Sequence, residues 1–155
     1  MNVDMNTAKL KKGFTLVELL IVIGILGILL AIVLVALNPA KQFAQANDTK
    51  RSSDVNAILN AVHQYAADNK GKLPTDVQET AENVSSSATN ICVDLVPKYL
   101  AQLPVDPDIN DGTPVSDCGA AYDTGYQIVK SATNSRVTVS APNAESEGVV
   151  ISVTR

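Results

Sequence analysis

The chain has 155 residues and a formal charge of −4 at pH 7, which is enough for one domain once a leader and an apolar segment are set aside. Beyond Leu37 there are 9 Lys and Arg against 14 Asp and Glu, a formal charge of −5. An acidic surface argues against broad binding of nucleic-acid phosphates. The sequence also has no phosphate loop, nucleophile elbow or Cys/His metal motif, so we expect no enzymatic activity.

Residues 1–13 form a short basic leader. It carries Lys9, Lys11 and Lys12 against a single Asp4, and positive charge beside a membrane span tends to stay cytoplasmic. The N-terminus is therefore expected to face the cytoplasm. An ordinary secretory signal would have a shorter apolar core that ends at an Ala-x-Ala-like site, and this sequence has neither.

An apolar segment follows the leader and carries one carboxylate. From Leu19 to Leu37 every residue is Leu, Ile, Val, Ala or Gly, and these 19 residues would form a helix of roughly 28 Å, which can span a bilayer. Glu18 stands at the start of this segment, where burying an acidic group is unfavourable, so a function is its default interpretation. Cutting after Gly13 would make Phe14 a new N-terminal cation, and Glu18 could pair with that ammonium in the same or a neighbouring subunit, which would set the axial register between subunits.

At Gly13, Phe14 and Glu18 the sequence resembles the type IV pilin and type II secretion pseudopilin family, whose precursors carry a Gly before the cleavage site, an aromatic first residue and a Glu four residues on. The strong resemblance covers roughly residues 9–40 and a weaker one reaches about residue 107. It implies cleavage after Gly13 by a prepilin peptidase, N-methylation of Phe14, an inner-membrane assembly platform, and a helical filament made of copies of the chain. The alternative is an uncleaved signal anchor with an incidental Glu.

Together these features predict a pilin-like α+β fold in four parts. Residues 1–13 are a cleaved leader, 14–38 a transmembrane and filament-core helix, 39–70 its amphipathic continuation, and 71–155 a globular head. An apolar stripe at helical spacing marks the amphipathic helix and comprises Val55, Ile58, Leu59, Val62 and Ala66. Polar residues such as Asp48 and Arg51 are assigned to the other faces. The helix is expected to end near residues 69–71, where Lys70-Gly71 is a stop signal.

The head is predicted to contain a small antiparallel sheet. Three stretches alternate with period two, at residues 126–130, 136–140 and 149–154, and short turn-rich connections favour a meander. One face of that sheet would cover the apolar stripe. Residues 76–90 are rich in Ser, Thr, Asn and Glu and are predicted to be a loop. His63, the only histidine, is expected to be a surface or boundary residue.

Cys92 and Cys118 are the only cysteines, and an even count in an exported domain indicates a disulfide. Closing a loop of 27 residues would contribute roughly 3 to 4 kcal/mol on the chain-entropy model. Two cysteines without a nearby histidine make a poor zinc site. Because 37 residues follow Cys118, the bridge is expected to hold the loop before the sheet.

An acidic stretch near residue 110 is a candidate calcium site. Its oxygen ligands fill the first, third, fifth and twelfth positions of an EF-hand-like loop and are Asp106, Asp108, Asn110 and Asp117. The match is imperfect because Gly112 is seventh where sixth is needed, and an acidic, solvated turn is the alternative. Major pseudopilins bind calcium in a loop of the head, and the resemblance extends to the turn Leu103-Pro104-Val105-Asp106-Pro107, which is similar to Leu-Pro-x-Asp-Pro in many pseudopilins.

Three functions are consistent with the sequence. The first is a structural subunit of a type IV pilus, held in the cell membrane with its head outside and later in an extracellular filament. The second is a type II secretion pseudopilin, and the third a membrane-anchored extracellular binding module that never polymerises. The chain ends in an apolar strand and Arg155, whereas major pseudopilins usually carry Gly-rich, Asp-containing calcium residues after the last strand, and this favours a pilin.

Overall fold

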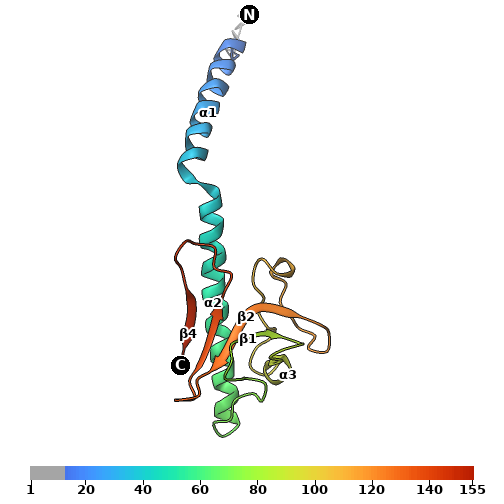
Figure 1. Ribbon diagram of the computed structural model, residues 1–155. Coiled ribbons are helices and arrows are strands. Elements are labelled where there is room, and N and C mark those ends of the chain that lie inside the picture. Colours follow the sequence, from blue (N-terminus) through green and yellow to red (C-terminus); the bar gives the residue numbers. More distant parts are fainter. Residues whose placement is uncertain (1–12) are drawn as a thin grey trace, which may run out of the picture. The chain divides into compact units, whose positions relative to one another are not determined.

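The computed structural model describes residues 13–155, which form two compact units that divide after Pro39 (Figure 1). The predicted leader lies outside the described residues except for Gly13. The first unit is the helix α1, Leu16–Leu37, whose residues are all exposed within the chain. It is the one helix in residues 13–155 that is long and apolar enough to cross a membrane.

The second long helix, α2, spans Pro39–Asp68. The sequence predicted that it continues the apolar helix, but the two are interrupted at Asn38, whose backbone is left-handed with φ 39°. Asn tolerates this conformation, and Pro39 has no N–H to donate to α1 but fits the first turn of a new helix. At its other end α2 stops where predicted, because Lys70 and Gly71 have positive φ and the Gly71 N–H donates to the Ala66 carbonyl at 2.7 Å.

The head contains a four-stranded antiparallel sheet in the order β1-β2-β3-β4 (Figure 1). Its strands are β1 (Glu82–Ser85), β2 (Asp123–Lys130), β3 (Val137–Ala141) and β4 (Ile151–Thr154). The predicted three-stranded meander is confirmed as β2 to β4. Strand β1 was missed, since it falls in the stretch predicted to be a loop and pairs with β2 through Glu82 opposite Ile128. Only Val84 and Ser85 of this strand are buried, so the sequence shows no apolar alternation that would predict a strand here.

Strand β4 begins two residues later than predicted. Gly148 has φ +74°, and the Val149 N–H donates to the Ser146 carbonyl, so a turn occupies the expected start of the strand. Val150 is consequently 87% exposed, whereas Ile151 is buried opposite Ala141.

The core of the head lies between α2 and the sheet. Its helical side is the predicted stripe with Ala61 in addition and without Ala66, which is only partly buried. Its sheet side includes Tyr126, Ile128, Val137 and Val139. Short segments close the remaining sides, among them the helix α3 (Cys92–Leu95), whose Cys92 and Leu95 are buried in the core. A 3-10 turn at Asn110–Gly112 has no buried residue. Every buried member of this core comes from residues 55–151, so the head buries its apolar side chains without using α1.

The segment before the 3-10 turn crosses β2 at Gly125. The Asp106 N–H donates to the Thr124 carbonyl at 2.9 Å. A Cβ on Gly125 would lie 2.5 Å from the Ile109 Cδ1 and 3.0 Å from the Asp106 Cβ, and the residue also has φ +74°. Both the space and the backbone conformation therefore require glycine here.

Replacing Gly125 by Ala should destabilise the head by about 2 to 4 kcal/mol, because strain at positive φ adds to overpacking against the crossing segment. Gly148→Ala is the matched control, since its φ is also +74° but no atom lies within 4 Å of the added Cβ. That control should lose only about 1 kcal/mol. Chemical denaturation of a fragment that begins at Ala40 measures both, and equal losses would contradict the close approach at Gly125.

Candidate functional site

The residues predicted to direct processing and assembly gather at the start of α1. Thr15 is the N-cap, and its hydroxyl oxygen accepts a hydrogen bond from the Glu18 backbone N–H at 3.2 Å. In return the Thr15 N–H and hydroxyl both donate to Glu18 Oε2, at 2.9 and 2.7 Å. This is a capping box, and its Thr-x-x-Glu pattern was legible in the sequence but was overlooked there.

The capping box leaves part of the Glu18 carboxylate available. Both of its hydrogen bonds go to Oε2, and within residues 13–155 no hydrogen bond is made to Oε1. Phe14 is 89% exposed just before the cap, and Gly13 is exposed in non-helical backbone. The structure thus places an accessible peptide bond and a partly unsatisfied carboxylate within six residues of each other.

A second site lies inside the head and is centred on Arg51, whose side chain is fully buried. Its five N–H donors make five hydrogen bonds. Nε and Nη2 donate to the two oxygens of Asp106 at 2.9 and 3.0 Å. Nη2 also donates to Asp108 at 2.6 Å. Nη1 donates to Asp48 at 2.9 Å and to Glu145 at 2.8 Å. Arg51 thereby joins α2, the 103–109 segment and the turn before β4.

This arrangement corrects the prediction that Arg51 and Asp48 lie on a solvent-facing side of the helix. Asp48, Arg51, Val55, Ile58 and Val62 succeed one another at spacings of three and four, so they share one face. A stripe defined by apolar residues alone begins at Val55, because it omits a charged residue that is buried and has ion-pair partners. The helical period itself was the signal that could have found Arg51.

Backbone and side-chain donors both hold the Asp48 carboxylate in place. The backbone N–H groups of Glu145 and Ser146 donate to its two oxygens at 3.0 and 2.8 Å, and Arg51 donates to Oδ1. Burial alone would raise the pKa of Asp48, but these hydrogen bonds outweigh it and hold the pKa well below its ordinary value. The carboxylate therefore stays ionised beside the guanidinium at neutral pH.

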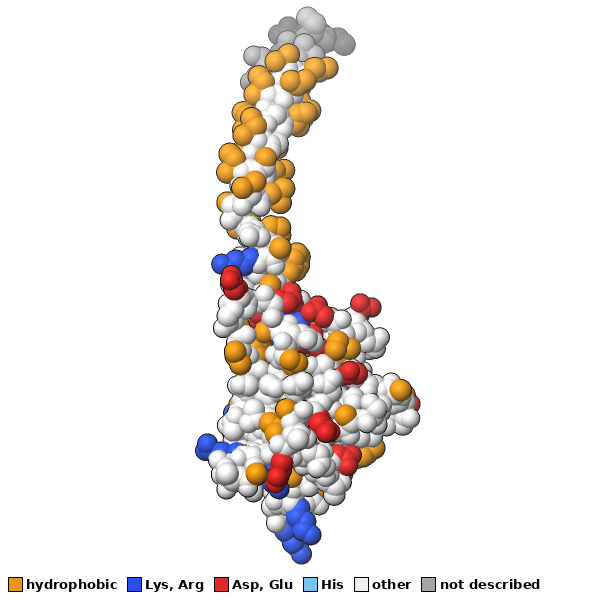
Figure 2. Space-filling model, in the orientation of Figure 1, with side chains coloured by type: hydrophobic (Ala, Val, Ile, Leu, Met, Phe, Trp, Pro, Cys, Tyr) orange, Lys and Arg blue, Asp and Glu red, His pale blue; other side chains and the backbone are white. Residues whose placement is uncertain are grey.

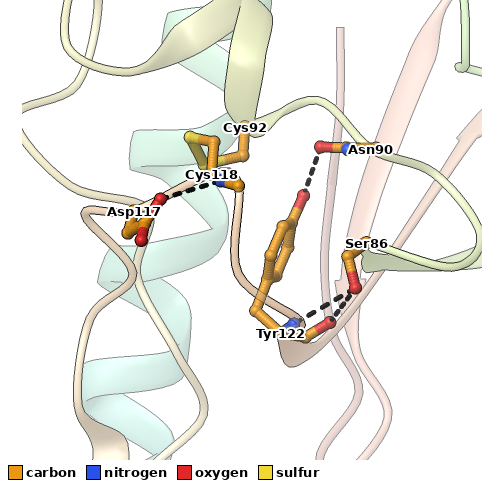
Figure 3. Close-up of a disulfide and its surroundings, with 7 residues drawn as sticks. Ser86, Asn90, Cys92, Asp117, Cys118 and Tyr122 are labelled. Atoms are coloured by element: carbon orange, nitrogen blue, oxygen red, sulfur yellow. Dashed lines mark hydrogen bonds between the residues drawn. A yellow bond between two sulfur atoms is a disulfide. The ribbon is translucent and has the colours of Figure 1, made fainter.

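A disulfide joins Cys92 at the start of α3 to Cys118, with Cα atoms 5.5 Å apart (Figure 3). Nearby, Tyr122 donates from its hydroxyl to Asn90 at 2.8 Å and from its N–H to Ser86 at 3.1 Å. The bridge therefore holds the segment that leads into β2, as the sequence predicted, and the final strands are free of it.

Three of the four oxygen ligands proposed for calcium have other partners in this structure, and the fourth, Asn110, begins the 3-10 turn. Both oxygens of Asp106 and one of Asp108 bind Arg51, while Asp117 accepts from the Gly119 N–H at 2.9 Å beside the disulfide. In the described part of the chain no group of three or more His, Cys, Asp or Glu residues is placed to hold a metal ion. This conformation does not fit the cation, and calcium binding stays a prediction that would require Asp106 to leave Arg51.

The N-terminal motif is recognised in comparison with known proteins. The model of the prokaryotic N-terminal methylation motif matches residues 8–34. The type II secretion system core protein G of Klebsiella pneumoniae is 34% identical over 99 residues, 63% of this chain and 69% of that protein. The same protein of Escherichia coli strain K12 is 34% identical over 103 residues, 65% of this chain and 69% of that protein.

The type IV wide pilus major component PilA4 of Thermus thermophilus is 35% identical over 94 residues, 53% of this chain and 70% of that protein. The chain belongs to the type IV pilin and type II secretion pseudopilin family. No solved structure shows a significant match. Membership of the family agrees with the long apolar helix and the α+β head of the structure.

In this member of the family the head depends on Arg51. Arg51→Leu would leave four carboxylates together without their cation, so the head should lose about 3 to 5 kcal/mol of stability or fail to fold. Arg51→Lys keeps the charge but not the five-donor fork, and its loss should be smaller. Denaturation of the fragment beginning at Ala40 measures both, and parental stability in the Leu variant would contradict the role of the cluster.

The pH dependence gives a second measurement of the same cluster. Because the folded-state pKa of Asp48 is depressed, its stabilisation is present above the unfolded pKa of about 4 and is lost as pH falls below that value. The parent head should therefore weaken steeply below about pH 4. Asp48→Asn should flatten that part of the profile.

Proposed function

We propose that this chain is a structural subunit of a type IV pilus-like extracellular filament. The observation that carries the proposal is the contrast between the head, which has a complete buried core, and α1, whose apolar side chains are all exposed. The head completes its core from residues 55–151, and α1, apart from Glu18, presents apolar residues on every side with none buried. Such a helix needs either lipid or other helices around it. Lipid before assembly and copies of itself in the filament meet both needs.

The start of α1 supports processing of the precursor. A prepilin peptidase would cut after Gly13, and the new amino group of Phe14 would be methylated, in keeping with the matched methylation motif. The subunit would then wait in the cell membrane as a single-pass protein with its N-terminus cytoplasmic and its head outside. An assembly platform in the inner membrane would move it into the growing filament.

Glu18 has a role in this scheme beyond capping. Its free Oε1 would accept the Phe14 ammonium of a neighbouring subunit inside the helical bundle, where an unpaired charge is unfavourable by several kcal/mol. A pairing between neighbouring subunits would favour one axial offset and so set the stagger of successive subunits.

A pseudopilin of a type II secretion system is the second candidate, favoured by the relatives named core protein G. We prefer the pilus subunit because of the acidic loop. The resemblance implies calcium in the heads of major pseudopilins, whereas here Arg51 holds the carboxylates of Asp106 and Asp108. In this conformation the carboxylates of the acidic loop already have a cation from the chain itself.

Deleting the chain from its cells decides between the candidates. If the pilus proposal is right, filaments sheared from the cell surface should disappear and secretion of folded proteins should continue. Loss of secretion with normal surface filaments would favour the pseudopilin. Cells in which both are normal would favour a membrane-anchored binding module. Electron microscopy of the sheared fraction and assay of the culture medium give the two readouts, with the restored gene as control.

Three variants separate the capping and the assembly roles of Glu18. Glu18→Gln keeps a capping box, since Gln serves at that position, but removes the charge. Thr15→Ala removes the cap, which costs about 1 kcal/mol, and keeps the charge. Glu18→Ala removes the charge and the side-chain half of the capping box, while the Thr15 hydroxyl can still accept from the backbone N–H of residue 18. Filaments should be abolished or strongly reduced in both Glu18 variants and nearly normal in Thr15→Ala.

The membrane fraction of the same cells supplies the control. All three variants should lose residues 1–13 and gain one methyl on Phe14, which mass spectrometry of the mature subunit detects. Their membrane levels should equal the parent level, because removing the carboxylate does not hinder insertion. Normal filaments from Glu18→Gln would reduce Glu18 to a helix cap.

A further inference from the structure

A group of cations surrounds the C-terminal end of α2. This basic tip comprises Lys70, Lys72, Lys130 and Arg136. None of the four makes an ion pair with any residue of the described range 13–155. In a head with an excess of acidic residues, four unpaired cations at one end are available for an external anion.

A hollow of about 540 Å³ lies at the basic tip, between the end of α2, the segment after Gly71 and the β2–β3 hairpin. Lys72, Lys130 and His63 line it, and no Asp or Glu does. Because the lining offers cations and hydroxyl groups without a carboxylate, the hollow is suited to acidic side chains entering from outside.

The opposite end of the head is acidic. This acidic end comprises Asp48, Asp106, Asp108, Asp111, Glu145 and Glu147. Arg51 binds four of them, which leaves that cluster negative by three charges, while Lys50 nearby is paired with Asp54. Asp111 and Glu147 are exposed and make no ion pair within the described residues. Figure 2 shows most of the acidic side chains of this view along the upper edge of the head, where basic ones also lie, and basic side chains at its lower tip, with further acidic groups between.

The two ends are too far apart to neutralise each other. Arg51 and Lys70 are 19 residues apart along α2 and its last turn, which corresponds to about 28 Å. Salt screens exposed charges beyond about 8 to 10 Å. Each end therefore needs a partner from another molecule, and the two ends are complementary to each other.

We propose that the basic tip of one subunit docks against the acidic end of a second copy of this chain, with Lys72 and Lys130 facing Asp111 and Glu147. This contact rests on the proposed filament. It joins different surfaces of identical subunits, head to tail along α2, and a contact of that kind propagates without closing. It also gives the heads their own axial register, independent of Glu18, and steers each incoming subunit by charge.

Zero-length carbodiimide crosslinking of sheared filaments tests the contact directly. The reagent joins a lysine amine only to a carboxylate that touches it, and about 28 Å separates the two ends within one head. Mass spectrometry should therefore find Lys72 or Lys130 joined to Asp111 or Glu147 in filaments, and the same link should be absent from detergent-solubilised subunits. Filaments that carry no such link would overturn the proposal.

Matched charge variants of the full chain provide the second arm. Lys72→Gln with Lys130→Gln should lower filament yield about tenfold, since exposed ion pairs are individually weak but recur at every subunit. Ala101→Glu with Gln102→Glu changes the net charge by the same two units on exposed residues that do not line the hollow, and should leave the yield unchanged. Equal yields from the two double variants would overturn the docking contact.

The outcomes also separate this contact from the function on which it rests. Parent cells without filaments would overturn the proposed function itself. The docking contact alone would be overturned if the parent forms filaments without the crosslink and the Lys72→Gln, Lys130→Gln variant assembles as well as the parent. Retention of the parent filaments on immobilised DNA, lost in that double variant while the crosslink is absent, would assign the basic tip to a polyanion and likewise overturn the contact.

Discussion

A buried guanidinium decides how the head is put together. The Arg51 side chain is shielded from solvent, so each of its five N–H groups must find an oxygen, and the five acceptors lie in α2, the 103–109 segment and the turn before β4. Rotating or sliding α2 by one residue would break several of these bonds at once and bury an unpaired charge. A buried ion cluster is weak support for net stability, but it excludes wrong registers strongly. The position of α2 against the sheet is therefore fixed by polar bonds at one end and by the apolar stripe from Val55 onwards at the other.

The sequence predicted the elements that apolar periodicity controls and missed those that depend on paired charges. The helix bounds, the β2–β4 meander and the disulfide followed from spacing and chemistry that act locally. Strand β1 could not be found in this way, because its side chains show no alternation and its place is set by pairing with β2, some 40 residues later in the chain. The acidic loop misled for a related reason, since Asp106 and Asp108 have the spacing of calcium ligands but serve a cation from a helix about 55 residues earlier.

The two ends of this head differ in charge, with carboxylates gathered at one end and lysines at the other. Clustering carboxylates around Arg51 leaves an excess of negative charge at one end, while the turns that close α2 and the β2–β3 hairpin bring lysines together at the other. Beyond the bonds to Arg51, the stability of a single head gains nothing from this sorting, because like charges repel within each end. A polymer of parallel subunits gains a complementary contact at each step. The distribution is thus easier to understand for a subunit than for an isolated domain.

The capping box at Glu18 bears on how one carboxylate can serve both in lipid and in a filament. In the unassembled helix Oε2 accepts two hydrogen bonds from Thr15, so the charge has partners close to the end of the apolar segment, where burial is less unfavourable than at its centre. Membrane insertion therefore does not depend on the ammonium of another subunit. In the proposed assembly that ammonium approaches Oε1 without displacing Thr15, and the new ion pair is a gain over a state that is already tolerated. Insertion and assembly are then separable steps, and a neutral Gln that keeps the box should pass the first and fail the second.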